Sequence, residues 1–255
     1  MTNIYHMVFF VNDNSLYIFF KGCNFFCKGC ILNYSPWDCH LPNDIQRQLQ
    51  LVKNIKPLSL SEVKTIIEKL NVKKAVLGGG EPSIDRELPH LIRMFNDLGV
   101  KTILLTNGYI LDEEFIRRLE DAGLDETCVS IKAYADRLHI FYTGKSNKQV
   151  LSNFSLLNNK SRITLRAESI LIPKLIDQYE IEKIARFIAS VNKSVPYRID
   201  GYMPIPNTQW SRPSPQEVLV AVQMAKKHLE NVSCIHSEME VKGDAINIYP
   251  YIKTG

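Results

Sequence analysis

Three cysteines stand close together near the start of the chain, in the spacing Cys-x3-Cys-x2-Cys. They follow an apolar run at residues 16–20, which predicts a strand that leads into a cysteine-rich loop. Each iron of a cubic [4Fe–4S] cluster needs one outside ligand, and protein thiolates usually supply it. Cys23, Cys27 and Cys30 are therefore candidate cluster ligands that leave one iron open for another molecule.

The three thiols are also compatible with roles outside a cluster. A structural zinc ion would need a fourth ligand, which Cys39 or His40 could supply. The three cysteines could also be buried apolar residues, although Lys, Gly and Asn surround them. A disulfide framework is disfavoured, because the chain has only six cysteines in 255 residues and opens without the leader of a secreted protein. The spacing favours a cluster over zinc.

A second motif with chemical meaning is Gly-Gly-Gly-Glu-Pro at residues 78–82. Because glycines have no side chains, they let a backbone edge approach a ligand closely. The same residues also suit a tight strand-to-helix turn in which Glu81 and Pro82 open the next helix. A third motif, Thr106-Asn107-Gly108, ends a later apolar run. The glycine motif alone predicts only a turn, but its place after the cysteine motif indicates a ligand site.

The rest of the chain alternates between short apolar runs and amphipathic stretches. Strands are predicted at residues 4–11, 16–20, 74–77, 100–105, 126–131, 163–172, 197–203 and 232–235. Helices are predicted at residues 44–52, 61–70, 86–98, 111–122, 147–157, 179–191 and 215–229. About six strand–helix units in series imply parallel strands joined by right-handed crossovers, hence an α/β barrel or an open doubly wound sheet.

No linker rich in Pro, Gly or Ser divides the chain, so residues 1–255 are predicted to form a single domain. Its core is expected at about residues 15–230, after an N-terminal strand. Residues 31–57 lack a clean period and are predicted to form a long functional loop. The tail, residues 243–255, is weakly patterned and is expected to be loose.

In such folds the chemistry collects at the carboxyl ends of the parallel strands. The residues that follow the predicted strands are therefore candidates for one shared site: Cys23, Cys27, Cys30, Gly79, Gly80, Glu81, Thr106, Asn107, Gly108, Lys132 and residues 207–210. The cysteines and the glycine motif fall on adjacent strand ends, so one ligand could touch both.

Together these motifs resemble the radical S-adenosylmethionine (SAM) superfamily, over about residues 16–210. The resemblance implies that the three cysteines hold a [4Fe–4S] cluster and that residues 79–82, Gly-Gly-Glu-Pro, form the motif for the SAM amino group. Thr106 and Asn107 match a strand-end Thr-Asn-Gly that is common in the superfamily. The fold that the resemblance implies is a partial (β/α)6 barrel, in agreement with the strand–helix units above.

The resemblance also implies the cofactors and the reaction. SAM would chelate the open iron through its amino and carboxylate groups. One electron from the reduced cluster would cleave the sulfonium bond and give a 5′-deoxyadenosyl radical, which takes a hydrogen atom from the substrate. The implied partners are SAM and an electron donor such as a ferredoxin or flavodoxin.

A narrower likeness is to the glycyl-radical-enzyme activating enzymes, of the pyruvate formate-lyase activating type. Residues 129–134 and 139–147 follow their Asp-Leu-Lys strand and Thr-Gly-x-x-Asn turn, and Arg166 followed by Pro173 resembles their strand-five arginine and proline. Lys132 and Arg166 would then help to hold the SAM carboxylate or ribose, and the substrate would be a protein or peptide. A surface charge or a structural ion pair is the alternative for each.

Several positions depart from that pattern. Gly29 stands before Cys30, where the superfamily usually has an aromatic residue near the adenine. The activating enzymes have Asp residues at the positions of Leu105 and Ser130, where they help to bind a monovalent cation, and a His after the proline matched to Pro206. These departures leave open a substrate that is a small metabolite, a cofactor precursor or RNA. Outside the enzymes, a structural metal-binding protein is the alternative.

Composition and charge exclude some other classes. Hydrophobic residues make up 45% of the chain, charged residues 23%, and the net charge is +4, which is ordinary for a globular protein. No apolar run is long enough to span a membrane, and no dense Lys/Arg stripe with interleaved aromatics indicates nucleic acid. A cytoplasmic enzyme is expected, and Cys128, inside a predicted strand, is expected in the core.

Overall fold

The computed structural model describes residues 1–239 and 244–252. Its chain begins with an antiparallel hairpin of β1 (Ile4–Phe10) and β2 (Ser15–Phe20). The turn between the strands is closed by Asp13, whose carboxylate accepts hydrogen bonds from the backbone and hydroxyl of Ser15. The two strands predicted at residues 4–11 and 16–20 are therefore confirmed, and β2 leads directly into the cysteine loop.

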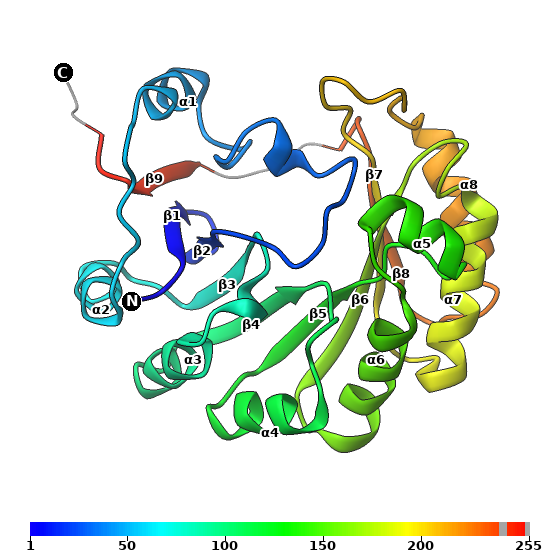
Figure 1. Cartoon of the computed structure of the whole chain (residues 1–255), viewed down its shortest axis with the longest axis horizontal. Helices are drawn as coiled ribbons and strands as arrows, with labels where there is room; N and C mark the ends of the chain where they lie inside the picture. Colours follow the sequence, from blue (N-terminus) through cyan, green and yellow to red (C-terminus); the bar gives the residue numbers. More distant parts are fainter. Residues whose placement is uncertain (240–243, 253–255) are drawn as a thin grey trace.

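Parallel strands follow β2 in chain order: β3 (Lys74–Gly79), β4 (Lys101–Thr106), β5 (Glu126–Ser130), β6 (Thr164–Leu171), β7 (Tyr197–Gly201) and β8 (Val232–Ile235). Each pairs in parallel with the strand before it, and the spatial order from one edge is β8-β7-β6-β5-β4-β3-β2-β1-β9. The strands curve around a common interior without closing (Figure 1). This is the expected partial (β/α) barrel.

Helices connect the strands: α1 (Asn43–Gln50), α2 (Leu60–Ile67), α3 (Leu88–Asp97), α4 (Glu113–Asp121), α5 (Asp136–Thr143), α6 (Lys148–Lys160), α7 (Gln178–Asn192) and α8 (Pro215–Ala225). Helices α3, α4, α6, α7 and α8 follow one another around the outer face of the curved sheet (Figure 1). Their apolar sides meet the outward-facing strand residues in one large core. No helix in the described ranges is long and apolar enough to cross a membrane.

The sequence signals for helix ends act as expected. Ser59 and Glu62 form a capping box at the start of α2, in which each side chain bonds the backbone of the other. Ser214 caps α8 in the same way. Gly99 and Gly123, at φ +70° and +90°, follow α3 and α4 and let the chain turn into the next strand.

Helix α5 is absent from the sequence prediction. Its apolar residues do not form one stripe, because Ile140 and Phe141 are exposed while Tyr142 is buried beside them. The periodicity that reveals a buried helix face is therefore missing. Asp136 begins the helix, and Gly144, in a left-handed conformation at φ +81°, ends it.

The expectation of a loose tail is wrong for residues 245–249. They form β9 (Ala245–Tyr249), which pairs antiparallel with β1. His6 secures this pairing, since its buried ring bonds the carbonyl of Tyr249 through Nδ1 at 2.7 Å. Residues 243 and 253–255 of the predicted tail lie outside the described ranges.

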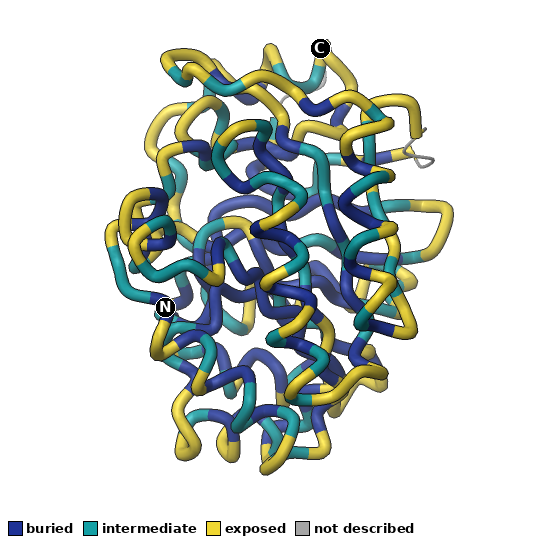
Figure 2. Tube along the Cα trace, turned by 90° about the vertical axis from the view of Figure 1, so that its right-hand side faces the viewer, coloured by how far each residue is buried: buried dark blue, intermediate teal, exposed yellow. Residues whose placement is uncertain are grey.

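Buried residues gather along the strands in the middle of the molecule, while the loops and outer helix faces are exposed (Figure 2). Residues alternate along each strand, one packing against the helices and the next facing the interior of the barrel. The segment between β2 and α1 reaches across that interior toward the end of β7 (Figure 1). This segment carries the cysteines.

Candidate active site

The cysteine loop begins where β2 ends and is fastened to the last turn of α5. The backbone N–H of Phe26 donates to the carbonyl of Thr143 at 2.9 Å, and that of Lys28 donates to Tyr142 at 3.0 Å. The last carbonyls of an α-helix have no partner within the helix, so they are free to accept bonds from another segment. Helix α5 therefore fixes the backbone on both sides of Cys27.

The three thiols lie near enough to affect one another. All six cysteines of the chain are free. Burial raises the pKa of Cys27 to about 11; the Lys132 ammonium opposes this shift, while the charges of Cys30 and Cys23 add to it. The Cys27 thiol thus resists ionisation. Binding to a cationic iron core would reverse that, because the metal replaces the protons and neutralises the thiolates. The donor set suits a cluster.

The glycine turn lies directly against the start of the cysteine loop. The backbone N–H of Gly80 donates to the carbonyl of Phe20 at 3.0 Å, and that of Glu81 donates to Gly22 at 2.8 Å. A Cβ at Gly80 would lie 2.1 Å from the carbonyl oxygen of Gly22, so no side chain fits there. Gly79 has φ +88°, a conformation that favours glycine. The glycine turn and the cysteine loop are therefore in contact, as predicted from their positions at the ends of adjacent strands.

The carboxylate of Glu81 accepts hydrogen bonds from other residues of the chain. It accepts hydrogen bonds from the Thr106 hydroxyl at 2.7 Å, the Asn107 backbone at 2.7 Å and the Ser83 hydroxyl at 2.6 Å. Burial raises its pKa, and these bonds oppose the shift. Glu81 thus ties the glycine turn to the end of β4, and we regard it as a positioning residue.

Asn107 extends this connection to the cysteine loop. Its Nδ2 donates to Oδ1 of Asn24 at 2.6 Å and lies 3.8 Å from Sγ of Cys23. The Nδ2 group of Asn24 is buried without a protein partner. An unsatisfied buried donor is costly, and a cluster sulfur could accept its hydrogen. This orphan donor beside Cys23 is a second observation that fits a cluster.

A cavity of about 720 Å³ opens beside these motifs. Of the predicted site residues, it is lined by Cys27, Cys30, Gly79 and Lys132. Its volume is that of a typical cofactor site. Nζ of Lys132 donates to the Ser130 hydroxyl at 2.6 Å, which holds the ammonium at the end of β5. Cys23, Gly80, Glu81, Pro82, Thr106 and Asn107 do not line this cavity.

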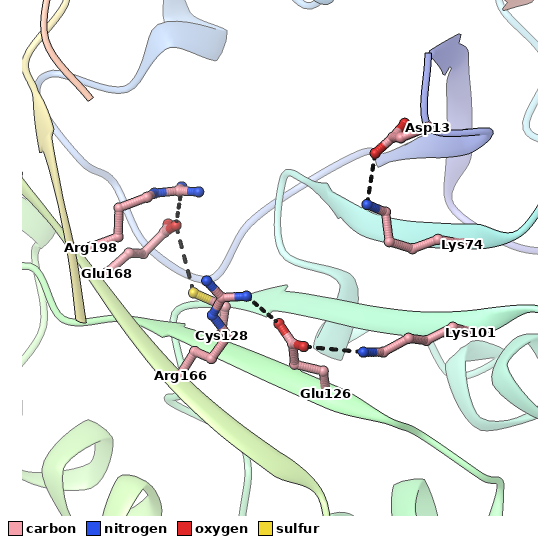
Figure 3. A network of polar contacts seen from close by, with 8 residues as sticks. All are labelled: Asp13, Lys74, Lys101, Glu126, Cys128, Arg166, Glu168 and Arg198. Atoms are coloured by element: carbon pink, nitrogen blue, oxygen red, sulfur yellow. Dashed lines mark hydrogen bonds and ion pairs between the residues drawn. The ribbon is translucent and has the colours of Figure 1, made fainter. Parts of the chain in front are cut away.

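The interior of the barrel contains a cluster of charged side chains that the sequence analysis did not predict. Arg198 on β7 pairs with Glu168 on β6 at 2.7 Å (Figure 3). Arg198 also pairs with Asp200 at 2.9 Å. The thiol of Cys128 lies 3.7 Å from the Glu168 carboxylate. Burial raises the pKa of Asp200 to about 6, although Arg198 opposes this shift. Glu168 and Asp200 line the cavity. The sequence analysis overlooked the alternation of residues along β6 and β7. This alternation places the side chains of Glu168, Arg198 and Asp200 on the interior face of the sheet.

The expected role of Arg166 is not supported by its position. Its guanidinium pairs with Glu126 at 3.1 Å, and Glu126 also pairs with Lys101 at 3.5 Å (Figure 3). Arg166 does not line the cavity. It lies two residues before Glu168 on β6, roughly 7 Å nearer the amino end of the sheet. The structural ion pair is therefore the role that this arginine fills.

Two tyrosines account for the glycine at position 29. A Cβ on Gly29 would lie 2.9 Å from the hydroxyl of Tyr142 and 2.9 Å from the ring of Tyr202. Both tyrosines are buried and line the cavity, and Trp210 packs against both rings at 5.9 and 6.1 Å between centroids. Aromatic rings from α5 and from the end of β7 thus fill the space beside Cys30.

The proposed fourth zinc ligands belong to a separate group. Asp38, Cys39 and His40 bring their ligand atoms within 4.8 Å of one another on the rim of the same cavity. The Asp38 carboxylate bonds Nδ1 of His40 at 2.7 Å, and this bond is the main cause that raises the pKa of His40 to about 10. His40 is therefore engaged with Asp38, and the Cys39 thiol lies 3.9 Å from Nδ1 of His40.

Comparison with known proteins agrees with this geometry. A putative glycyl-radical enzyme activating enzyme of Methanocaldococcus jannaschii is 34% identical over 217 residues, which are 84% of this chain and 77% of that protein. A probable GTP 3′,8-cyclase of Metallosphaera sedula is 33% identical over 104 residues, 40% of this chain and 32% of the cyclase. Streptococcus suis SuiB bound to SAM has a similar fold, with a TM-score of 0.63 at 14% identity over 85% of this chain and 48% of that one.

A protein-family profile matches most of the chain and shows its family. Residues 17–188 match the profile of the Radical SAM superfamily, and this range includes the cysteine loop, the glycine turn and Lys132. Enzymes of this superfamily use a [4Fe–4S] cluster and SAM, the cofactors that the cysteine spacing and the glycine motif indicate. This chain belongs to the radical SAM superfamily and is an enzyme similar to the glycyl-radical activating enzymes.

Proposed function

We propose that Cys23, Cys27 and Cys30 bind the [4Fe–4S] cluster and that the enzyme acts on a protein or peptide substrate, in the manner of an activating enzyme. When bound, the cluster and SAM supply a 5′-deoxyadenosyl radical that takes a hydrogen atom from the substrate. The observation that carries the proposal is that Cys27, Cys30, Gly79 and Lys132 line one cavity, while the glycine turn is bonded to Gly22 next to Cys23.

The chain contributes position and charge to this chemistry. The backbone of Gly79 forms the wall on which the amino group of SAM would rest, and Glu81 holds that wall in place. The Lys132 ammonium faces the cavity and suits the SAM carboxylate. Tyr142 and Tyr202 line the cavity next to Cys30, where the adenine would pack. Buried rings at that place also keep water from the reacting atoms.

A protein substrate is supported by the relative from Methanocaldococcus jannaschii, whose similarity covers most of both chains. A nucleotide-sized substrate is the second candidate, and similarity to the GTP 3′,8-cyclase supports it over 40% of the chain. The cluster needs one electron for each SAM cleaved, and we assign this supply to a ferredoxin or flavodoxin. A purely structural metal-binding protein is set aside, because the superfamily consists of enzymes.

One anaerobic experiment tests the cofactor part of this proposal. Purified protein with a reconstituted cluster is analysed for iron and sulfide, then incubated with SAM and titanium(III) citrate. We expect four irons for each chain and steady formation of 5′-deoxyadenosine. Zinc in place of iron, or SAM left intact, would contradict the proposal.

The substrate class is tested by adding candidates to the same reaction. A glycyl-radical enzyme whose gene lies near the gene of this protein should acquire the electron paramagnetic resonance doublet of a glycyl radical. Incubation with GTP is the matched alternative, with a cyclised nucleotide as its product. A nucleotide product without any protein radical would replace the activating role by the second candidate.

A further inference from the structure

An exposed apolar and basic surface lies on the outside of the cysteine loop. Phe26 is 79% exposed although it sits between two of the predicted cluster ligands. Ile140 and Phe141, on the last turn of α5, are 45% and 49% exposed. Nζ of Lys28 lies 5.2 Å from the centre of the Phe141 ring. Arg137 is exposed one helical turn before Phe141, on the same side of α5.

These five residues form one continuous surface, here called the α5 face. The ring of Phe26 reaches Gly144 at the end of α5, since a Cβ on Gly144 would lie 3.6 Å from it. The backbone of Lys28 is bonded to the same helix end. A cluster of exposed aromatic and aliphatic residues costs solubility, so such a cluster commonly marks a binding surface.

The charge of the α5 face has one sign. No ion pair found among the described residues involves Lys28 or Arg137. Lys145 lies just beyond Gly144, with its ammonium 4.6 Å from the ring of Tyr109. Lys148 is exposed at the start of α6. Asp136, the acidic residue of α5, is bonded to Ser146 and Asn147. Apolar residues rimmed by unpaired cations suit a partner with an acidic rim.

The position of the α5 face indicates what that partner does. Helix α5 holds the backbone on both sides of Cys27 with the hydrogen bonds from Phe26 and Lys28. The cavity is lined by Cys27 and Cys30, and no residue of the α5 face belongs to its lining. A partner on the α5 face would thus be close to the cluster ligands and outside the cavity. This is the place where an electron could enter while the cavity holds SAM and substrate.

We propose that the α5 face is the docking surface for an acidic one-electron carrier protein; this inference rests on the proposed reductive cleavage of SAM. In the docked complex the carrier loses one electron, the cluster gains it, and no group or proton is transferred. Phe26, Ile140 and Phe141 form the dry centre of the contact, and Lys28 and Arg137 steer the acidic carrier toward it.

The test compares a protein donor with a small-molecule donor on the same cluster-loaded enzyme. Initial rates of 5′-deoxyadenosine formation are measured with reduced flavodoxin at several concentrations, and separately with titanium(III) citrate. The variants are Phe141→Ser and Arg137→Glu, both on α5 and outside the cavity. Matched controls are Tyr179→Ser, with an exposed ring on α7, and Lys160→Glu, at the far end of α6.

We expect both variants to raise the KM for flavodoxin about tenfold, with an unchanged rate from titanium(III) citrate. The controls should leave both rates unchanged. Direct titration with oxidised flavodoxin should show the same tenfold loss of affinity, and the affinity of the unchanged enzyme should fall as salt is added. This binding measurement does not depend on turnover.

Three results would overturn the inference. The first is an unchanged KM and affinity in both variants, with flavodoxin and with an acidic ferredoxin as a second probe. The second is an equal loss with titanium(III) citrate, which would place the effect in the active site. The third is binding of a single-stranded RNA that is tighter than binding of flavodoxin and is weakened by the same variants. This result would show that the α5 face binds a different partner. Absence of 5′-deoxyadenosine from the unchanged enzyme with either donor would instead refute the proposed function itself.

Discussion

The carboxylate of Glu81 accepts a hydrogen bond of 2.7 Å from the backbone N–H of Asn107, and so joins the glycine turn after β3 to the end of β4. Asn107 in turn bonds Asn24 beside Cys23. The glutamate of the Gly-Gly-Glu-Pro motif thereby acts on the cysteine loop through one intermediate residue. Its side chain builds the site, and the backbone of its neighbours faces the ligand.

Replacing Glu81 by Gln should weaken both the fold and SAM binding. The amide would present an N–H₂ group to donors that now face a carboxylate, leaving at least one of them unpaired at a cost of about 1–3 kcal/mol. Denaturant unfolding and calorimetric titration with SAM measure the two effects. The control is Glu62→Gln in the exposed cap of α2, where we expect a loss below about 1 kcal/mol and unchanged SAM affinity. Equal behaviour of the two variants would refute the positioning role.

Gly80→Ala should prevent the glycine turn from closing on the cysteine loop. The added methyl group would overlap the carbonyl of Gly22, which is backbone and cannot move away cheaply. We therefore expect loss of cluster retention, seen as a low iron content after reconstitution. Gly99→Ala is the matched control, because nothing lies within 4 Å of its Cβ, and its φ of +70° should cost only about 1 kcal/mol. Full iron in the Gly80 variant would refute the close approach.

Changing Cys23, Cys27 or Cys30 to Ala should abolish both the cluster and SAM cleavage, because two thiolates do not hold the cube stably. Iron analysis, the visible spectrum and 5′-deoxyadenosine formation measure this. Cys128→Ala is the control: its thiol faces Glu168, and we expect full iron with at most a modest stability loss. A variant of any of the first three that kept full iron would show that the ligands are assigned wrongly.

SAM cleavage should not depend on sodium or potassium. A hard cation needs oxygen ligands, yet Leu105 has none in its side chain and Ser130 accepts a hydrogen bond from the Lys132 ammonium. That ammonium occupies the neighbourhood where a cation would need negative charge. The measurement exchanges the buffer cation for tetramethylammonium at constant ionic strength. A large fall in 5′-deoxyadenosine, restored by potassium, would reveal a cation site.

His6 should make the fold acid-sensitive. Its Nδ1 donates to Tyr249 and its Nε2 accepts from the backbone N–H of Asp38, so the ring must be neutral. Burial lowers its pKa to about 4. The stability it contributes is complete above pH 6.5 and is lost as the pH falls toward 4, by about 3 kcal/mol.

Denaturant unfolding between pH 7 and pH 4 measures this loss. His6→Asn should be less stable at pH 7 but should show a flatter pH profile. The exposed His90→Asn is the control and should keep the original slope. An unchanged slope in the His6 variant would assign the acid sensitivity to other groups.

The sequence predicted the parts of the site that depend on local order. Gly22, next to Cys23, and Gly80 meet because β2 and β3 are adjacent parallel strands, whose carboxyl ends must share one edge. The partner of Arg166 could not be predicted because it depends on register, which places Arg166 opposite Cys128 and Glu168 opposite Arg198. One sequence does not reveal that register. Likewise the local sequence around β9 was weakly patterned, and only its pairing with β1 defines this strand.

The last turn of α5 has two structural roles. It anchors the backbone around Cys27 through Phe26 and Lys28, and it carries Ile140 and Phe141 on its outer side. Oxygen damage that frees the cysteine loop would therefore also disturb the surface that faces the electron carrier. On the docking proposal, a damaged enzyme would therefore also bind its electron carrier less well.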